Sequence, residues 1–487
     1  MKRNKSKKVQ AWSTKDVVLN VLVYLFNAVI IALLFYSSIY INGLKGEMNV
    51  DAYFANLTTF LHFVVSLVIT VSCMAIYFVI EDRDFLKKPV NSQMLFLIIE
   101  ISIIVCYAIG AYVNVNLRPL AFAALMTLFV TNRKTAIFIN MIYCVIVFLF
   151  DSFGAESFSV GNYPVLIMGF ASGVIAVIAM DKVNSRLQLL TRSAFVSLPT
   201  LLCVGMSLIE HNGGAVAESL ASAAFSGPLA IAIFMLLLPV FEATFKKVSS
   251  FKYSELTDHK AKLIRKLIQQ APGTFNHSIV VSNIAEACAA AIDDDALLAR
   301  TCAYYHDIGK LRRPEFFKEN QADGFNPHDD LTPELSSNII KSHTQDGYNF
   351  VIKNKLPQEI ADVCLQHHGT LPILYFYDKA KKFTDGEVDL AQYCYAGPKP
   401  KTKIAAIIMI ADGCEAAARS LQDRSRENVK NVVRKIVNDR MELGQFDDCE
   451  ITLKELNIII HTVVNNLTGI YHSRIEYPKV NLDGMVL

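Results

Sequence analysis

Long apolar runs in the first half of the chain constrain its fold more than any other feature. Eight runs are as long, or nearly as long, as the roughly 20 apolar residues that a membrane-spanning helix needs. They lie near residues 17–41, 55–80, 93–113, 118–131, 135–151, 162–180, 193–209 and 222–245. The fourth is short and is closely followed by the fifth. Because the chain is 53% hydrophobic and only 19% charged, we expect a polytopic helical membrane bundle over residues 17–248.

Basic residues between these runs predict the orientation of the bundle, because Lys and Arg favour cytoplasmic loops. The amino terminus, residues 1–16, is basic, and the first run is longer than the apolar core of a cleaved signal peptide. Eight crossings would place both termini in the cytoplasm. The expected cytoplasmic residues are Arg83, Lys87 and Lys88, then Arg133 and Lys134, then Lys182, Arg186 and Arg192, then Lys246, Lys247 and Lys252. The opposite loops carry little more than Lys45 and Arg118.

The composition changes sharply after Phe245. Residues 249–270 are charged and compatible with a helical linker that leads away from the bilayer. Residues 271–487 are enough for one soluble domain with its own core. Apolar residues recur there at three- and four-residue spacing, as in Val280, Ile284 and Ala287, which is typical of helices. We therefore predict an all-α protein, a membrane bundle followed by an all-helical cytoplasmic domain.

Cysteine spacing and net charge exclude some kinds of function. The ten cysteines are scattered singly, so neither a disulfide framework nor a zinc ribbon is indicated. The net charge of +2 is not concentrated on a basic face, which argues against a nucleic-acid polymer as partner. The lipid bilayer is the partner that the composition predicts.

Histidines and carboxylates of the second half form a pattern that suits metal ions. His306 and Asp307 are adjacent, and neighbours on a helix point about 100° apart, so a carboxylate here can bridge two cations. Asp412 lies in an apolar helical run, where an unpaired carboxylate would be costly. Taken alone, each histidine would more often be a surface residue or a hydrogen-bonded core residue than a metal ligand. Together they predict a two-metal hydrolytic site of mixed imidazole and carboxylate ligands, which suits iron, manganese or another first-row metal. The candidates are His277, His306, Asp307, His343, His367, His368 and Asp412.

The sequence motifs around these residues resemble those of the seven-transmembrane HD-domain (HDIG) phosphodiesterase family, the PgpH-like enzymes. They are Pro272-Gly273-Thr274-Phe275-Asn276-His277, His306-Asp307-Ile308-Gly309-Lys310, His343-Thr344-Gln345-Asp346-Gly347, Gln366-His367-His368-Gly369-Thr370, Gly397-Pro398-Lys399-Pro400-Lys401, and Ile410-Ala411-Asp412 with Glu415-Ala416-Ala417. The resemblance implies a phosphodiesterase that opens cyclic di-AMP to linear pApA at a di-iron or di-manganese centre in a bacterial cell membrane.

The resemblance also implies how the ligands divide. His277, His306, Asp307 and Asp412 would hold one metal ion, and Asp307, His343, His367 and His368 the other. Asp307 would be catalytic as the bridging ligand. Lys310 could offset charge on the phosphoryl group or assist the leaving oxygen, although a lysine after a helix end is often simply solvated. A helix that leaves a membrane could further support a homodimer.

One departure from the family leaves the catalytic inference intact, and one likeness to a second family keeps an alternative substrate open. Members usually carry a large extracytoplasmic domain between the first two spans, whereas only a short loop near residues 42–53 stands here. His343-x-x-x-Gly347-Tyr348 is similar to the HD-GYP cyclic di-GMP phosphodiesterases, but Asn349 replaces their proline. Hydrolysis of another nucleotide, cyclic di-GMP or a guanosine polyphosphate, remains one alternative. A membrane receptor that binds a nucleotide without cleaving it remains another.

Overall fold

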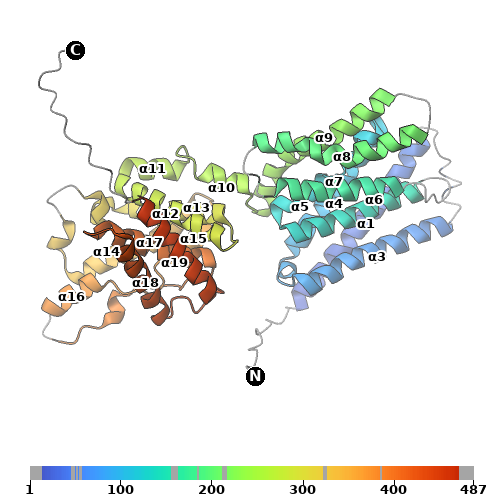
Figure 1. The fold of residues 1–487 in the computed structure, drawn as a ribbon. Coiled ribbons are helices and arrows are strands. Elements are labelled where there is room, and N and C mark those ends of the chain that lie inside the picture. Colours follow the sequence, from blue (N-terminus) through green and yellow to red (C-terminus); the bar gives the residue numbers. More distant parts are fainter. Residues whose placement is uncertain are drawn as a thin grey trace, which may run out of the picture. The chain divides into compact units, whose positions relative to one another are not determined.

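The computed structural model describes residues 14–44, 50, 53, 57–154, 163–181, 183, 186–210, 216–321, 326–383 and 386–470 (Figure 1). These residues form helices and connections without a β-strand, so the all-α prediction is confirmed. Contacts divide the chain into two compact units, Met1–Ser249 and Ser250–Leu487. The division falls one residue after the boundary expected from the change in composition.

The first unit is a bundle of apolar helices. Its elements are α1 (Thr14–Leu44), α3 (Leu57–Glu81), η1 (Phe85–Lys87), α4 (Pro89–Tyr112), η2 (Val115–Leu117), α5 (Phe122–Val130), α6 (Arg133–Phe153), α7 (Tyr163–Met180), α8 (Arg186–Glu210) and α9 (Val216–Phe245). All of these α-helices except α5 contain a segment long and apolar enough to cross a membrane, which makes seven. The chain is therefore a multi-pass membrane protein.

The fourth apolar run, expected to span the membrane over 118–131, does not form a full crossing helix. Helix α5 has nine residues, about 14 Å at 1.5 Å per residue, which is less than half of the roughly 30 Å hydrocarbon core. Pro119 precedes α5, and the side chain of Asn132 caps the start of α6 by accepting a hydrogen bond from the Thr135 amide (3.0 Å). These two residues shorten the helix within an apolar run of almost sufficient length.

Residues 114–133 nevertheless pass from one end of the bundle to the other. Before α5, Asn114 donates a hydrogen bond to Glu218 in the first turn of α9 (3.3 Å). After α5, Arg133 lies 3.8 Å from Asp181, the residue that follows α7. The 25 residues of α8 separate the end of α7 from the start of α9, so the two contacts mark opposite ends. The bundle thus has eight passages, seven made by long helices and one by a short helix with irregular flanks.

Protein surrounds the middle of this passage. Every residue from 120 to 127 is buried, so α5 and the two residues before it are enclosed by other helices, whereas Val113 and Val115 before them are exposed. Arg118 enters this passage and pairs with Asp151 of α6 (2.8 Å), each side chain being only 12% exposed. Tyr107 of α4 donates to the second oxygen of Asp151 (2.6 Å), and the Arg118 guanidinium lies over the Tyr107 ring. This ion pair fixes the passage to α4 and α6.

Replacing Arg118 with alanine is expected to lower the free energy of unfolding of the membrane unit by about 3–5 kcal/mol, because Asp151 would keep a buried charge without its cation. Unfolding of the full chain in detergent measures the change. Arg133→Ala is the matched control, since Arg133 and Asp181 are 54% and 38% exposed and such a pair contributes at most about 1 kcal/mol. Equal effects of the two substitutions would contradict the structural role of the buried pair.

Polar side chains also anchor α1 against the start of α4. Asn20 donates to the Leu86 carbonyl (2.7 Å) and accepts from Ser92 (2.8 Å), so α1 packs specifically against the start of α4.

Glu100, in the middle of α4, is 5% exposed, and within the described part of the chain its Oε1 atom makes no hydrogen bond. His62 lies exposed on α3.

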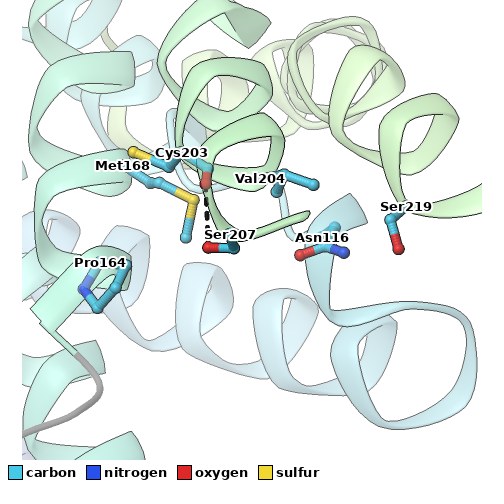
Figure 2. Close-up of a pocket in the computed structure, with 7 residues that line it drawn as sticks. All are labelled: Asn116, Pro164, Met168, Cys203, Val204, Ser207 and Ser219. Atoms are coloured by element: carbon cyan, nitrogen blue, oxygen red, sulfur yellow. Dashed lines mark hydrogen bonds between the residues drawn. The ribbon is translucent and has the colours of Figure 1, made fainter. Parts of the chain in front are cut away.

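The bundle has a hollow of about 260 Å³ between η2, α7, α8 and α9 (Figure 2). In it the Ser207 hydroxyl donates to the Cys203 carbonyl (3.1 Å). The lining residues are Asn116, Pro164, Met168, Cys203, Val204, Ser207 and Ser219. None is a candidate metal ligand, and the hollow belongs to the end of the bundle where α9 begins.

The second unit packs its helices around α17. Its helices are α10 (Ser250–Leu256), α11 (Lys262–Gln270), α12 (Pro272–Ala291), α13 (Ala296–Tyr305), α14 (Pro333–Lys353), α15 (Gln358–Gln366), α16 (Leu374–Phe383), α17 (Lys403–Ser420), α18 (Arg426–Glu442) and α19 (Leu453–Ile470). Short 3₁₀ turns are η4 (Ile308–Arg312), η5 (Pro314–Phe316), η6 (Lys318–Asn320), η7 (Pro327–Asp330) and η8 (Leu390–Tyr393). Residues 404–411 of α17 are all buried, as expected for a helix that is apolar on every side.

The segment expected to be a linker, residues 249–270, belongs to the second unit from Ser250 onwards. It is helical as predicted, but Leu256, Leu263 and Leu267 are buried in the core of this unit. Tyr305, at the end of α13, donates a hydrogen bond to the Leu256 carbonyl (2.8 Å). The apolar face of α11 explains the difference, because such a face is buried against other elements rather than left in solvent.

Candidate metal centre

The second unit brings all seven candidate ligands together from five helices. His277 lies in the second turn of α12, which begins at Pro272. His306 and Asp307 follow α13 directly, where the chain changes into η4. His343 lies in the middle of α14, His367 and His368 follow α15, and Asp412 lies in the middle of α17. Ligands more than 130 residues apart in the sequence therefore meet at one place.

Asp307 lies between two sets of imidazoles. Its Oδ2 atom is 3.3 Å from Nε2 of His306 and 3.8 Å from Nε2 of His277. Its Oδ1 atom is 3.3 Å from Nε2 of His343 and 3.7 Å from Nε2 of His367. Each carboxylate oxygen thus faces a different set, which is the arrangement a bridging ligand requires.

The possible ligand atoms form two groups that share Asp307, and within each group they lie within 4.8 Å of one another. Asp412 contacts both sides. Its Oδ1 is 3.0 Å from Nε2 of His277, and its Oδ2 is 3.7 Å from Nδ1 of His368. The first group is His277, His306 and Asp307, and the second is Asp307, His343, His367 and His368.

Buried polar atoms at this place fit a pair of cations. Nε2 of His306 and Oδ1 of Asp307 are buried, and neither has a hydrogen-bond partner among the residues that the structure describes. Buried polar atoms are normally hydrogen-bonded, because burial without a partner costs free energy. Both atoms are electron-pair donors to divalent metals. The side chains therefore suit divalent metal ions chemically as well as geometrically.

Hydrogen bonds fix the tautomers of three histidines. In each, Nδ1 lies within hydrogen-bond distance of the carbonyl oxygen three residues earlier in the chain. Because a carbonyl only accepts, Nδ1 carries the proton and Nε2 offers its lone pair to the centre. The pairs are His306 with Ala303 (2.7 Å), His343 with Ile340 (2.6 Å) and His367 with Cys364 (2.9 Å).

At Asp307, His367 and His368 the surroundings also favour the protonation states that metal ligands need, whereas at His277 they favour the protonated ring. Burial raises the pKa of Asp307, but Lys310 and His306 outweigh it and hold this pKa well below its usual range. Burial lowers the pKa of His367 and, more strongly, that of His368. Burial alone would lower the pKa of His277, but hydrogen bonds to carboxylates raise it to about 10. Asp307 is therefore ionised and His367 and His368 are neutral at neutral pH, as metal binding requires.

Lys310 is part of the centre rather than a solvated lysine. Its Nζ atom lies 2.8 Å from Oδ2 of Asp307 and 2.7 Å from Oε1 of Glu319. Glu319 in turn accepts a hydrogen bond from Thr274 of α12 (3.1 Å). Burial lowers the pKa of Lys310, but these two carboxylates more than compensate and raise it. Lys310 thus stays charged and holds one oxygen of Asp307.

Three contributors escaped the sequence reasoning as functional residues: Glu319, Tyr395 and Glu415. The Tyr395 ring stacks on His368 (4.4 Å between centroids), and Glu415 contacts His277 (2.5 Å). Glu415 stands one helical turn after Asp412, and that spacing is the signal that could have identified it. Glu319 lies in a 3₁₀ turn, and no periodicity marks it. His461 lies exposed on α19, outside the centre, and His472 lies outside the described residues.

Family models match both units. Residues 57–249 match the family described as a 7TM receptor with intracellular HD hydrolase, and residues 274–417 match the HD domain. The chain belongs to the seven-helix membrane HD family. All seven candidate metal ligands lie within residues 274–417, the part of the chain that matches the HD domain. An HD hydrolase domain implies divalent metal binding, in agreement with the donor set.

Known relatives extend the comparison. The chain is 36% identical over 420 residues to the cyclic-di-AMP phosphodiesterase PgpH of Bacillus subtilis (strain 168), which covers 83% of this chain and 58% of that protein. It is 39% identical over 366 residues to the protein of the same name from Listeria monocytogenes serotype 1/2a (strain 10403S), which covers 74% of this chain and 50% of that one. The chain thus spans about half the length of the curated relatives it matches.

Solved structures of an HD domain are also similar to part of the chain. The HD domain of the L. monocytogenes phosphodiesterase PgpH is 49% identical and covers 43% of this chain and 99% of that chain, with a TM-score of 0.42. A second structure holds that domain in complex with cyclic-di-AMP. It is also 49% identical and covers 44% of this chain and 99% of that chain, with a TM-score of 0.42.

Proposed function

We propose that this chain is a membrane-anchored, metal-dependent phosphodiesterase that hydrolyses cyclic di-AMP to linear pApA. The single observation that carries the proposal is the buried Asp307, whose two oxygens face two separate sets of imidazoles. That arrangement suits two cations about one carboxylate, as two-metal phosphate hydrolysis requires. The substrate is inferred from the two relatives named cyclic-di-AMP phosphodiesterase.

The proposed ligands follow the two groups of side chains, with Asp412 added to the first group because its Oδ1 lies 3.0 Å from Nε2 of His277. His277, His306, Asp307 and Asp412 would hold one cation, and Asp307, His343, His367 and His368 the other. Iron and manganese suit this set, which contains no thiolate; the nearby Cys364 directs its Sγ to the Tyr305 carbonyl instead (3.3 Å). Two such cations supply Lewis acidity and lower the pKa of a bound water towards neutrality.

The chain's own residues would orient and balance this chemistry. Asp307 joins the two halves of the centre, and Lys310 holds its Oδ2 atom in place (2.8 Å). The positive charge of Lys310 also lies close enough to offset negative charge that develops on the phosphoryl and leaving oxygens. We assign Lys310 this supporting role because its contacts with Asp307 and Glu319 keep it charged.

We infer that the protein lies in a bacterial cell membrane with both termini and the HD domain in the cytoplasm. Eight passages bring the start of α1 and the end of α9 to the same end of the bundle. Lys87, Arg133 and Lys246 all belong to that end, and an excess of basic residues is typical of the cytoplasmic side. A homodimer remains a prediction from the helix that follows the membrane unit.

Side-by-side turnover of cyclic di-AMP and cyclic di-GMP by the full-length protein in detergent, loaded with Fe²⁺ or Mn²⁺, tests the function. We expect preferential formation of pApA. Faster cleavage of cyclic di-GMP would favour the HD-GYP-like alternative. Tight binding of a cyclic dinucleotide without hydrolysis, in metal-loaded protein, would favour the receptor alternative and overturn the proposal.

A further inference from the structure

His277 differs from His306, His343 and His367 in the partner of its Nδ1 atom. His306, His343 and His367 each donate from Nδ1 to a carbonyl of their own chain segment. Nδ1 of His277 instead lies 2.5 Å from Oε2 of Glu415, on a different helix. His277 therefore has an anionic Nδ1 partner outside the ligand set, where these three histidines have a neutral one; Nδ1 of the fifth, His368, lies 3.7 Å from the candidate ligand Asp412.

Helix α17 contacts both nitrogens of this ring. Asp412 and Glu415 are three residues apart, and residues at that spacing share one face of a helix. Asp412 lies 3.0 Å from Nε2 of His277, and Glu415 lies 2.5 Å from Nδ1. The imidazole is thus held from two sides by a single helix, which fixes both its position and its rotation.

Burial strengthens the effect of the Glu415 contact. Glu415 is 2% exposed and His277 is 6% exposed, so water screens their interaction only weakly. Arg419 lies 3.9 Å away from the other oxygen of Glu415 and is itself 47% exposed. A carboxylate that accepts from Nδ1–H keeps the proton there, orients the ring and makes Nε2 a stronger electron donor.

We propose that Glu415 is a positioning residue that makes the cation position of His277, His306 and Asp412 the tighter of the two. It acts through His277, which it holds with Nδ1 protonated and Nε2 directed to the centre. The inference rests on the proposed function in one respect, that His277 is a metal ligand. It gives a role to a residue outside the ligand set and predicts that the two cations bind with unequal affinities.

Mn²⁺ binding to the metal-free full-length protein, measured by calorimetry and by electron paramagnetic resonance, tests the inference. The wild type should bind two ions with unequal affinities. Glu415→Ala should weaken the tighter position by about 10–100-fold, the usual effect of removing such a partner of a metal-bound histidine, and leave the other unchanged. The amide oxygen of Glu415→Gln still accepts from Nδ1–H but carries no charge, so the Mn²⁺ affinity of its tighter position should lie between those of the wild type and Glu415→Ala.

Glu286→Ala is the matched control. Glu286 lies on the same helix as His277, but it is 36% exposed and pairs with Arg300, so both affinities should stay unchanged. A melting curve of each variant separates weaker binding from loss of fold. If Glu415→Ala does not fold, the selective effect of Glu415→Gln on one position decides the test.

The outcomes distinguish the inference from the function on which it rests. A wild type that binds fewer than two Mn²⁺ ions would overturn the ligand assignment itself. A wild type that binds two ions, with folded Glu415 variants that bind both ions equally well, would overturn the role of Glu415 and leave the proposed function intact. Equal weakening of both positions would also contradict the inference, because a general structural role predicts that result.

Discussion

Replacing Asp307 with alanine is expected to abolish turnover and to empty the centre of metal. Asp307 is the one residue common to both groups of possible ligand atoms in the described part of the chain, so its loss weakens both positions at once. If the cations supply about 4 kcal/mol of transition-state stabilisation, the rate falls by about 10³-fold. Metal analysis and pApA formation by the full-length variant measure the two effects.

His461→Ala serves as the control for this experiment. His461 lies exposed on α19 and outside the centre, so its replacement should change neither metal content nor rate. An Asp307→Ala variant that keeps two ions and measurable turnover would contradict the bridging role. Loss of turnover with both ions retained would instead indicate that Asp307 acts on the substrate rather than on the metals.

Gly309→Ala is expected to disrupt the centre without touching a ligand side chain. A Cβ atom on Gly309 would lie 1.9 Å from the carbonyl oxygen of His343 and 2.5 Å from the amide nitrogen of Gly347. Both are backbone atoms of α14 and cannot rotate away, so η4 and α14 must separate. Because η4 follows Asp307 and α14 carries His343, the separation should release metal and lower the free energy of unfolding by about 1–3 kcal/mol or more.

Gly469→Ala is the matched substitution at an open position. A Cβ atom there meets nothing within 4 Å, and alanine favours a helix over glycine by up to about 1 kcal/mol. Stability and metal content should therefore be unchanged or slightly increased. A Gly309→Ala protein with wild-type metal content and melting temperature would contradict the close approach of η4 to α14.

Residue pattern alone was sufficient to predict the all-α fold and to select the candidate ligands that the structure brings together. Hydrophobic length predicted the seven long helices, and the adjacent His306 and Asp307 led to the centre. Prediction from the residue pattern failed where tertiary contacts determine the length or the position of an element. An apolar run over 118–131 has the composition of a spanning helix, and only Pro119 and Asn132 show that the helix is short. Glu319 reaches Lys310 from a 3₁₀ turn, which no spacing rule predicts.

The segment 249–270 shows a second limit of composition. Its charges suggested a helical linker that leads away from the bilayer, yet Leu263, Ile264 and Leu267 follow the spacing of a buried helix face. The apolar spacing, rather than the charge, determined where the segment packs. Charge on one face of a helix does not prevent burial of the other.

The short passage through the membrane unit has a consequence for how its sequence can change. Only 17% of the apolar window of α1 is buried in protein, so most positions there face lipid, where one apolar side chain serves about as well as another. Residues 120–127 instead meet protein on every side, and close packing makes even a change of one methylene felt. Across generations, α5, the shortest α-helix among the described residues of this unit, should therefore drift least, and substitution rate rather than hydropathy would reveal it.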